Sequence, residues 1–288
     1  MLEVVKMTHV YQYWRSTLIS YPHLWSSIFV GNGHRDFAAT CLERSREAPL
    51  TARLDLEHGE YYLESTPVRQ TDIEGDPSCH YRAMLAPLLE ADCIRRIRKL
   101  DVHLIMEERL KEDVENDPEE IFRGALDDFG FFEFPLPVLE SLNFRVIHEF
   151  DHKYPLELPE GLFCWGSLPP ATLRHLALHG CFGGPFQEVR DLTSFELDAY
   201  GDTFDPESME LDQHTFAPFI SGNPSLVSLH FVGCGFPDDA WTPPITPAKL
   251  PELKSLQLTE THGLPNFPNL VDVPAFKTLS SLRILARR

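Results

Sequence analysis

The stretch Leu253-Lys254-Ser255-Leu256-Gln257-Leu258 decides how most of this chain is expected to fold. Its apolar residues stand at the first, fourth and sixth positions. Side chains alternate between the two faces of a strand, so the fourth and sixth positions share one face and predict a strand buried on that face. The same spacing occurs in seven copies, whose apolar residues are Ile97, Leu100, Val102; Leu139, Leu142, Phe144; Leu173, Leu176, Leu178; Leu192, Phe195, Leu197; Leu226, Leu229, Phe231; Leu253, Leu256, Leu258; and Leu279, Leu282, Ile284.

The spacing of the copies is that of an irregular repeat. Cys181 and Cys234 each fall three residues after the last apolar position of their copy, where leucine-rich repeats place Asn or Cys. The last two periods, from Leu226 to Leu253 and on to Leu279, are 27 and 26 residues, within the range of such repeats. The earlier steps of 42, 34, 19 and 34 residues imply insertions. We therefore expect an irregular leucine-rich-repeat solenoid with a parallel sheet.

The positions between the apolar residues predict an open face of that sheet. The third, fifth and seventh positions of the copies give 21 side chains, of which only Ala177, Val232 and Leu285 are aliphatic. A sheet buried on both faces would not show this pattern. These residues are either solvated strand positions or a partner-binding surface, as on the concave side of a solenoid. The candidate partner-binding face consists of Lys99, Asp101, Asn143, Arg145, His175, His179, Glu196, Asp198, His230, Gln257 and Arg283.

The N-terminal third combines helices and strands. The segment 1–27 predicts two short helices, separated at Tyr21-Pro22 because proline disfavours helical geometry in the residue before it. A strand entry follows at residues 28–30, and a helix is expected from Phe37 to Arg46. Beyond it, apolar and polar residues alternate from Leu50 to Leu56, which predicts a half-buried strand.

Two tryptophans and a proline give the N-terminal segment a recognisable motif. It resembles the second half of F-box-like domains in large fungal families of basidiomycete type, which show V-C-x-x-W-R followed by L-x-S-x-P-x-L-W-S-x-I. Tyr11 replaces the usual cysteine. Residues 42–50 are similar to the L-x-R-S-x-x-x-P-L stretch that leads into the repeats of those families. The residues that carry the motif, with a structural or adaptor-facing role, are Val10, Trp14, Arg15, Leu18, Pro22, Leu24 and Trp25.

The resemblance implies a function in ubiquitin transfer. F-box proteins bind a Skp-type adaptor of a cullin-RING ubiquitin ligase and hold a target protein with their C-terminal repeats. The family's first helix, L-P-x-E-[IVL]-L-x-x-I-F, should precede Val10, and the sequence given begins after it. We therefore expect an F-box truncated at its N-terminus. We also expect a truncated array, because only four residues follow Ile284 and no polar cap is present.

Two alternatives stay open. The chain is either a substrate receptor of a ligase, or a binding scaffold or degenerate family copy without a ligase link. Large aromatic residues are usually buried, so Trp14 and Trp25 are expected to pack in a small helical core, with a surface for the adaptor as the alternative. The fold class is α/β, divided into a partial F-box-like helical segment at 1–30, a connecting region with a first strand at 31–90, and the solenoid at 91–288.

The charge of the chain excludes several partners. Its 44 acidic and 25 basic side chains give a formal net charge of -19. Binding to nucleic acid or to an anionic membrane surface requires a basic stripe, so neither is expected. The acidity serves solubility or selects a basic partner. The six cysteines are dispersed, and the sequence shows neither a secretory signal nor an apolar run long enough to span a membrane, which predicts free thiols in the cytoplasm or nucleus.

The sequence contains no convincing catalytic or metal-binding motif. Of its thirteen histidines, His148 and His152 are four apart, but Pro155 argues against a helix there. Cys79-His80 is the other candidate pair. The motifs G-x-S-x-G and G-x-x-x-x-G-K-[ST] are absent. Cys181 is better explained as a buried turn cysteine than as a nucleophile. We therefore expect a protein that is not an enzyme and has no cofactor.

Overall fold

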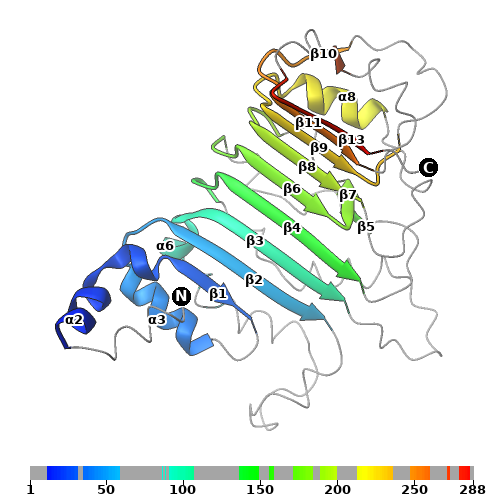
Figure 1. Ribbon diagram of the computed structural model, residues 1–288. Coiled ribbons are helices and arrows are strands. Elements are labelled where there is room, and N and C mark those ends of the chain that lie inside the picture. The colour runs from blue at the N-terminus through cyan, green and yellow to red at the C-terminus, as the bar shows by residue number, and fades with distance from the viewer. Residues whose placement is uncertain are drawn as a thin grey trace, which may run out of the picture.

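The structure is built on one parallel sheet of nine strands (Figure 1). It is a computed structural model that describes residues 12–31, 35–58, 86, 88, 91–106, 136–148, 156–158, 171–183, 189–199, 213–235, 247–259, 271–272 and 279–285. The neighbouring strands are, in order, β1 (Ser27–Val30), β2 (Leu50–His58), β3 (Ile97–Met106), β4 (Ser141–His148), β6 (His175–His179), β8 (Ser194–Asp198), β9 (Ser228–Val232), β11 (Ser255–Thr259) and β13 (Ser281–Leu285). The fold is therefore α/β with a parallel sheet, as the sequence predicts.

The other described elements are short. The helices are α2 (Gln12–Ser20), η1 (Pro22–Trp25), α3 (Arg35–Ser45), α6 (Ala91–Ile94) and α8 (Gln213–Ser221). Two small parallel pairs join β5 (Leu156–Leu158) to β7 (Cys181–Gly183) and β10 (Ala248–Lys249) to β12 (Val271–Asp272). Figure 1 shows α2 and α3 near the β1 end of the sheet and α8 near the other end. Within the described ranges, no helix has the length and hydropathy to cross a bilayer.

All seven strands predicted from the apolar spacing are present, and their register explains the spacing. The fourth positions lie side by side along the sheet, from Leu100 through Leu142 to Leu256, and the sixth positions form a second row. Both rows are buried from β3 to β11, while the residues between them are not. β13 is the exception, because its Leu282 and Ile284 are 45% and 49% exposed at the sheet edge.

The backbone repeats the same connection from strand to strand. The carbonyl of Val227, the second residue of its copy, accepts hydrogen bonds from the N–H groups of Lys254 and Ser255, at 2.9 and 3.0 Å. Equivalent pairs of hydrogen bonds are accepted by the carbonyls of Glu140, Arg174, Thr193 and Lys254. The first apolar position of each copy is packed below this connection, as for Leu253, which is 2% exposed. One local structure thus recurs although the sequence separations differ.

The sheet also extends toward the N-terminus. β1 pairs with β2, and β2 pairs with β3 over its full length, both in parallel. The sheet therefore continues across the boundaries expected at 30/31 and 90/91. Arg96 helps to place β2 beside β3, because its Nε and Nη2 atoms donate to the Ala48 carbonyl and Nη2 also donates to Ser45 Oγ.

The two tryptophans of the N-terminal motif have different environments. Trp25 in η1 is 1% exposed, as expected for a core residue. Its indole N–H donates to the Leu18 carbonyl at 2.9 Å, and the Arg44 guanidinium lies 4.4 Å from its ring centroid. Trp14 in α2 is 58% exposed, so the expectation that it packs in a core is wrong. Within α2, Leu18 and Ile19 are partly buried, whereas Trp14 lies on the exposed part of the helix.

Helix α8 covers the buried face of the sheet at strands β8 and β9. Its Phe216 and Phe219 contact Phe195 on β8, and Phe216 also contacts Phe231 on β9. After the helix, the buried Asn223 accepts a hydrogen bond from the Leu192 N–H at 2.9 Å. This amide therefore links the end of α8 to the turn before β8.

Replacing Asn223 with alanine is expected to lower the free energy of unfolding by about 2–3 kcal/mol. Its Nδ2 donates to the carbonyls of Val189 and Phe219, so the substitution removes these two buried hydrogen bonds together with the one from the Leu192 N–H. Urea unfolding followed by circular dichroism measures the change. Asn143→Ala, on a partly exposed position, should cost less than about 1 kcal/mol, and equal losses in the two variants would contradict the prediction.

Candidate functional site

The polar face of the sheet is the candidate site. We call it the open face and define it as the strand residues that alternate with the two buried rows. All eleven residues predicted for a partner-binding surface lie on it. One row runs from Asp101 through Asn143, Glu196 and His230 to Gln257 and Arg283, and the neighbouring row contains Arg145, His179 and Asp198. Lys99 and His175 lie on a third row, where the strands begin.

The open face also includes residues that the sequence analysis missed. Arg53 and Asp55 of β2 lie beside Asp101 and His103 of β3. The alternation of apolar residues from Leu50 to Leu56 already predicted a strand, and its outward positions were the available signal. They were not included because the region 31–90 was expected to connect two units rather than to join the sheet.

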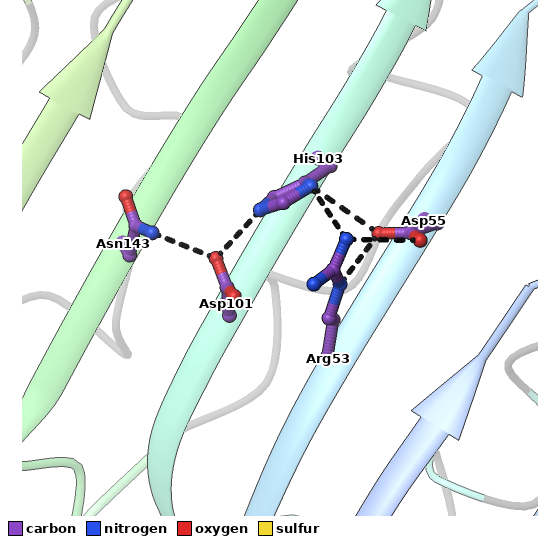
Figure 2. Close-up of polar contacts among 5 residues, drawn as sticks. All are labelled: Arg53, Asp55, Asp101, His103 and Asn143. Atoms are coloured by element: carbon purple, nitrogen blue, oxygen red, sulfur yellow. Dashed lines mark hydrogen bonds and ion pairs between the residues drawn. The ribbon is translucent and has the colours of Figure 1, made fainter.

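Five side chains from three strands form a connected network, shown in Figure 2, which we call the β2–β4 cluster. Arg53 donates to both carboxylate oxygens of Asp55, at 3.0 and 3.3 Å. His103 lies between the two aspartates, with Nε2 at 3.0 Å from Asp101 Oδ1 and Nδ1 at 3.4 Å from Asp55 Oδ1. Asn143 Nδ2 donates to the same oxygen of Asp101 at 2.8 Å.

His103 also contacts the guanidinium of Arg53, whose Nη2 lies 3.2 Å from His103 Nδ1. A guanidinium can only donate, so the same ring nitrogen faces a donor from Arg53 and the carboxylate of Asp55. With histidine counted as neutral, one guanidinium and two carboxylates give the cluster a formal charge of -1.

A second group of ionisable side chains lies further along the open face. This β4–β9 cluster consists of Arg145, His179, Glu196, Asp198 and His230. His179 Nδ1 is 3.4 Å from Asp198 Oδ2, and His230 Nδ1 is 3.3 Å from Glu196 Oε1. The hydrogen bond from His230 lowers the pKa of Glu196, and the charges of His230, His179 and Arg145 act in the same direction against partial burial.

The lowered pKa of Glu196 predicts a pH-dependent contribution to stability. A carboxyl group whose native pKa lies below its unfolded value stabilises the fold above the unfolded value, about 4.3, and loses that contribution as the pH falls through the native pKa. Glu196→Gln should lower Tm by about 1–3 °C at pH 6, and the difference should shrink as the pH falls below the unfolded value. Thermal unfolding at several pH values measures this. Glu252→Gln, at an exposed turn, is the control, and a difference that grows on acidification would contradict the prediction.

The structure describes four of the six cysteines. Cys41, Cys93, Cys181 and Cys234 are all buried. Burial raises the pKa of Cys41 to about 11 and raises the pKa of Cys181 and Cys234 further. A reactive cysteine needs a lowered pKa, so these thiols do not fit a nucleophile. Cys181 is buried, as predicted, but it begins strand β7 and does not lie in a turn.

The metal hypotheses receive no support from the part of the chain that the structure describes. Within it, no three His, Cys, Asp or Glu side chains are arranged to hold a metal ion. Three of the four candidate residues, Cys79, His80 and His152, lie outside the described residues.

The N-terminal motif is divided between core and surface. Trp25 is buried, and Leu18, Pro22 and Leu24 are partly buried. Trp14 and Arg15 are exposed, and Tyr13 contacts the Trp14 ring edge-on at a centroid distance of 6.4 Å. Val10 lies outside the described residues. One part of the motif thus stabilises the helical segment and another part is accessible.

The described part of the chain is therefore an α/β protein built on a nine-stranded parallel sheet, whose buried face forms the core and whose open face is polar. No family model, curated protein or solved structure matches the chain.

Proposed function

We propose that this chain is a protein-binding module whose open face holds a protein partner. The observation that carries the proposal is the continuity of the open face: its polar residues lie side by side from β2 to β11 while the opposite face is buried. Regular polar strand surfaces of this extent are a common binding surface of repeat proteins. The proposal assigns no catalytic step to the chain and places it in the cytoplasm or nucleus.

We also propose that the sheet belongs to an irregular leucine-rich-repeat solenoid. The recurring connection before each strand and the matching apolar positions support this, because both are properties of a repeated unit. The variable distances between the copies fit insertions between the recurring strand units.

The proposed link to a ubiquitin ligase depends on the N-terminal segment. Exposed aromatic side chains on α2 and just after it, namely Tyr13, Trp14 and Tyr21, favour a contact with another protein, since large exposed apolar groups often mark such sites. In the F-box-like hypothesis this contact is a Skp-type adaptor. The alternative is a binding scaffold or degenerate family copy in which the open face acts without a ligase.

A site-specific cross-linking experiment tests the open face. A photoreactive benzoylphenylalanine at Ala177, in the centre of the face, should cross-link a defined protein in cells, whereas the same group at the exposed Glu252 turn should not. Identical products from both positions would contradict a partner on the open face.

Co-purification with a Skp-type adaptor tests the ligase hypothesis separately. Wild-type protein should retain the adaptor, and a Tyr13→Ala/Trp14→Ala variant should lose it while keeping the same circular dichroism spectrum. Absence of the adaptor from the wild-type complex would contradict the ligase link and leave the scaffold alternative in place.

A further inference from the structure

Strand β13 ends the sheet with apolar side chains that are exposed on both of its faces. Among the described strands, β13 pairs only with β11 (Figure 1). Leu282 and Ile284 are 45% and 49% exposed, whereas the residues beside them on β11 are both 2% exposed. Leu285, which lies on the open face, is 44% exposed. An exposed apolar edge of this kind is a place where another strand can add to a sheet.

The repeat of the sheet defines the strand that would extend it. From β4 to β11, the carbonyl of the second residue of each copy accepts two N–H groups from the start of the next copy. Ser280 holds this second position in the last copy. A strand added in parallel and in the same register would donate two N–H groups to the Ser280 carbonyl, and its fourth and sixth residues would lie beside Leu282 and Ile284. Apolar residues at these two positions would bury both exposed side chains.

The charge around β13 favours an acidic residue in that strand. Residues 273–288 contain four basic side chains and no acidic one, in a chain whose net charge is -19. Arg283 is exposed on the open face, between the two apolar residues, and has no ion pair within the described part of the chain. Its neighbour in the same row, Gln257, is uncharged. A carboxylate at the fifth position of an added strand would lie beside Arg283 and pair with it.

We propose that the edge of β13 binds an extended segment of a partner protein, which joins the sheet as a parallel strand and carries an acidic residue between two apolar ones. Backbone hydrogen bonds give such a segment affinity, and its side chains give it specificity. A second copy of the chain is a poorer occupant, because pairing of two β13 edges would bring two basic segments together. The edge is separate from the clusters of the open face, so this inference goes beyond the proposed function.

Fluorescence anisotropy with a labelled peptide, blocked at both ends, tests the proposal on the full chain. The probe is Leu-Thr-Ser-Phe-Glu-Leu-Asp, the sequence of residues 192–198, which combines the apolar spacing with an acidic fifth residue. A peptide with glutamine and asparagine in place of its acidic residues should bind about two- to fivefold more weakly. The peptide Leu-Thr-Ser-Glu-Phe-Asp-Leu, whose apolar residues are shifted by one position, should bind at least about tenfold more weakly. Equal binding of the three peptides, or no binding of the probe up to about 1 mM, would overturn the proposal.

Two double variants assign the binding to the edge. Leu282→Ser/Ile284→Ser removes exposed apolar side chains of β13 and should weaken the probe at least about tenfold. Val138→Ser/Ile147→Ser is the matched control, because these residues are 36% and 38% exposed but lie beside and within β4. It should bind the probe as the wild type does, and circular dichroism verifies that both variants are folded. Equal losses would mean that the probe adheres to apolar surface in general, and the proposed site would be wrong.

Arg283→Gln separates the charged contact from the apolar ones. Loss of the guanidinium should weaken the acidic probe about two- to fivefold and leave binding of its uncharged form unchanged. Arg98→Gln, on the exposed part of β3, removes the same charge elsewhere and should have no effect. If Arg98→Gln weakens the probe as much as Arg283→Gln does, the acidic residue responds to overall charge and the proposed pairing is wrong.

Two further measurements identify the occupant. Hydrogen exchange should slow at residues 281–285 when the probe is bound, and unchanged exchange there would show that it binds elsewhere. Sedimentation velocity should show the wild type without self-association through this edge. A dimer that is lost in Leu282→Ser/Ile284→Ser would instead make a second copy the occupant and overturn the acidic partner. Cross-linking at Ala177 reports on the open face alone, so failure of one proposal leaves the other intact.

Discussion

Phe195→Ala is expected to reduce the free energy of unfolding by about 3–5 kcal/mol. Phe195 is fully buried on β8 and contacts three other phenylalanine rings, with centroid distances of 4.7 Å to Phe219, 6.1 Å to Phe231 and 6.4 Å to Phe216. Two of these rings belong to α8 and one to β9. Truncation therefore removes apolar contacts with the helix and with the neighbouring strand, and leaves a cavity between them.

Urea unfolding monitored by far-ultraviolet circular dichroism measures this loss. A 3–5 kcal/mol change is a large part of the total stability of a typical protein. Phe29→Ala is the matched control, because Phe29 lies on β1 and is only partly buried, beside Arg53 on the open face. It should cost about 1 kcal/mol or less. A Phe195→Ala variant within 1 kcal/mol of the wild type would show that α8 does not pack on the sheet in solution.

The strands of the sheet could be predicted because the apolar spacing that defines each of them lies within six residues. The first apolar position of a copy precedes the strand, and the fourth and sixth positions share one face of it. Leu253, Leu256 and Leu258 fit this arrangement, and so do the copies from β3 to β9. β13 has the same spacing and register, but its Leu282 and Ile284 are exposed at the sheet edge. The eleven candidate residues of the open face followed from the same alternation.

The clusters on the open face were harder to predict because they depend on register between distant segments. Arg53 and His103 are 50 residues apart in the sequence but lie on adjacent strands. Only the observation that β2 joins the sheet places them together. The variable insertions between strands hide this register, since no constant period connects β2 to β3 in the way that it connects β9 to β11.

Helix α8 illustrates a different difficulty. It is only nine residues long and contains Pro218, so its sequence does not have a strong helical pattern. Its formation is explained by tertiary packing of Phe216 and Phe219 on the sheet rather than by local propensity. The exposed Trp14 is the converse case: its residue type favours burial, but the described surroundings provide no core for it.

Trp25→Ala is expected to destabilise the protein by about 3–5 kcal/mol. The substitution removes a buried ring from the start of the sheet, together with the hydrogen bond to the Leu18 carbonyl and the stacking of Arg44. These contacts connect α2, η1 and α3, so their loss should also release the N-terminal helices from β1. Hydrogen exchange should therefore increase first at residues 12–25 and 35–45.

Trp14→Ala provides a control of the same residue type in the same motif. Trp14 is largely exposed, so its removal should change the free energy of unfolding by less than about 1 kcal/mol. If Trp14→Ala nevertheless abolishes adaptor binding, the effect must come from a lost contact rather than from unfolding. A destabilisation equal to that of Trp25→Ala would instead mean that both tryptophans belong to one core, as the sequence alone predicts. The pair therefore decides whether the accessible half of the motif is free to bind another protein.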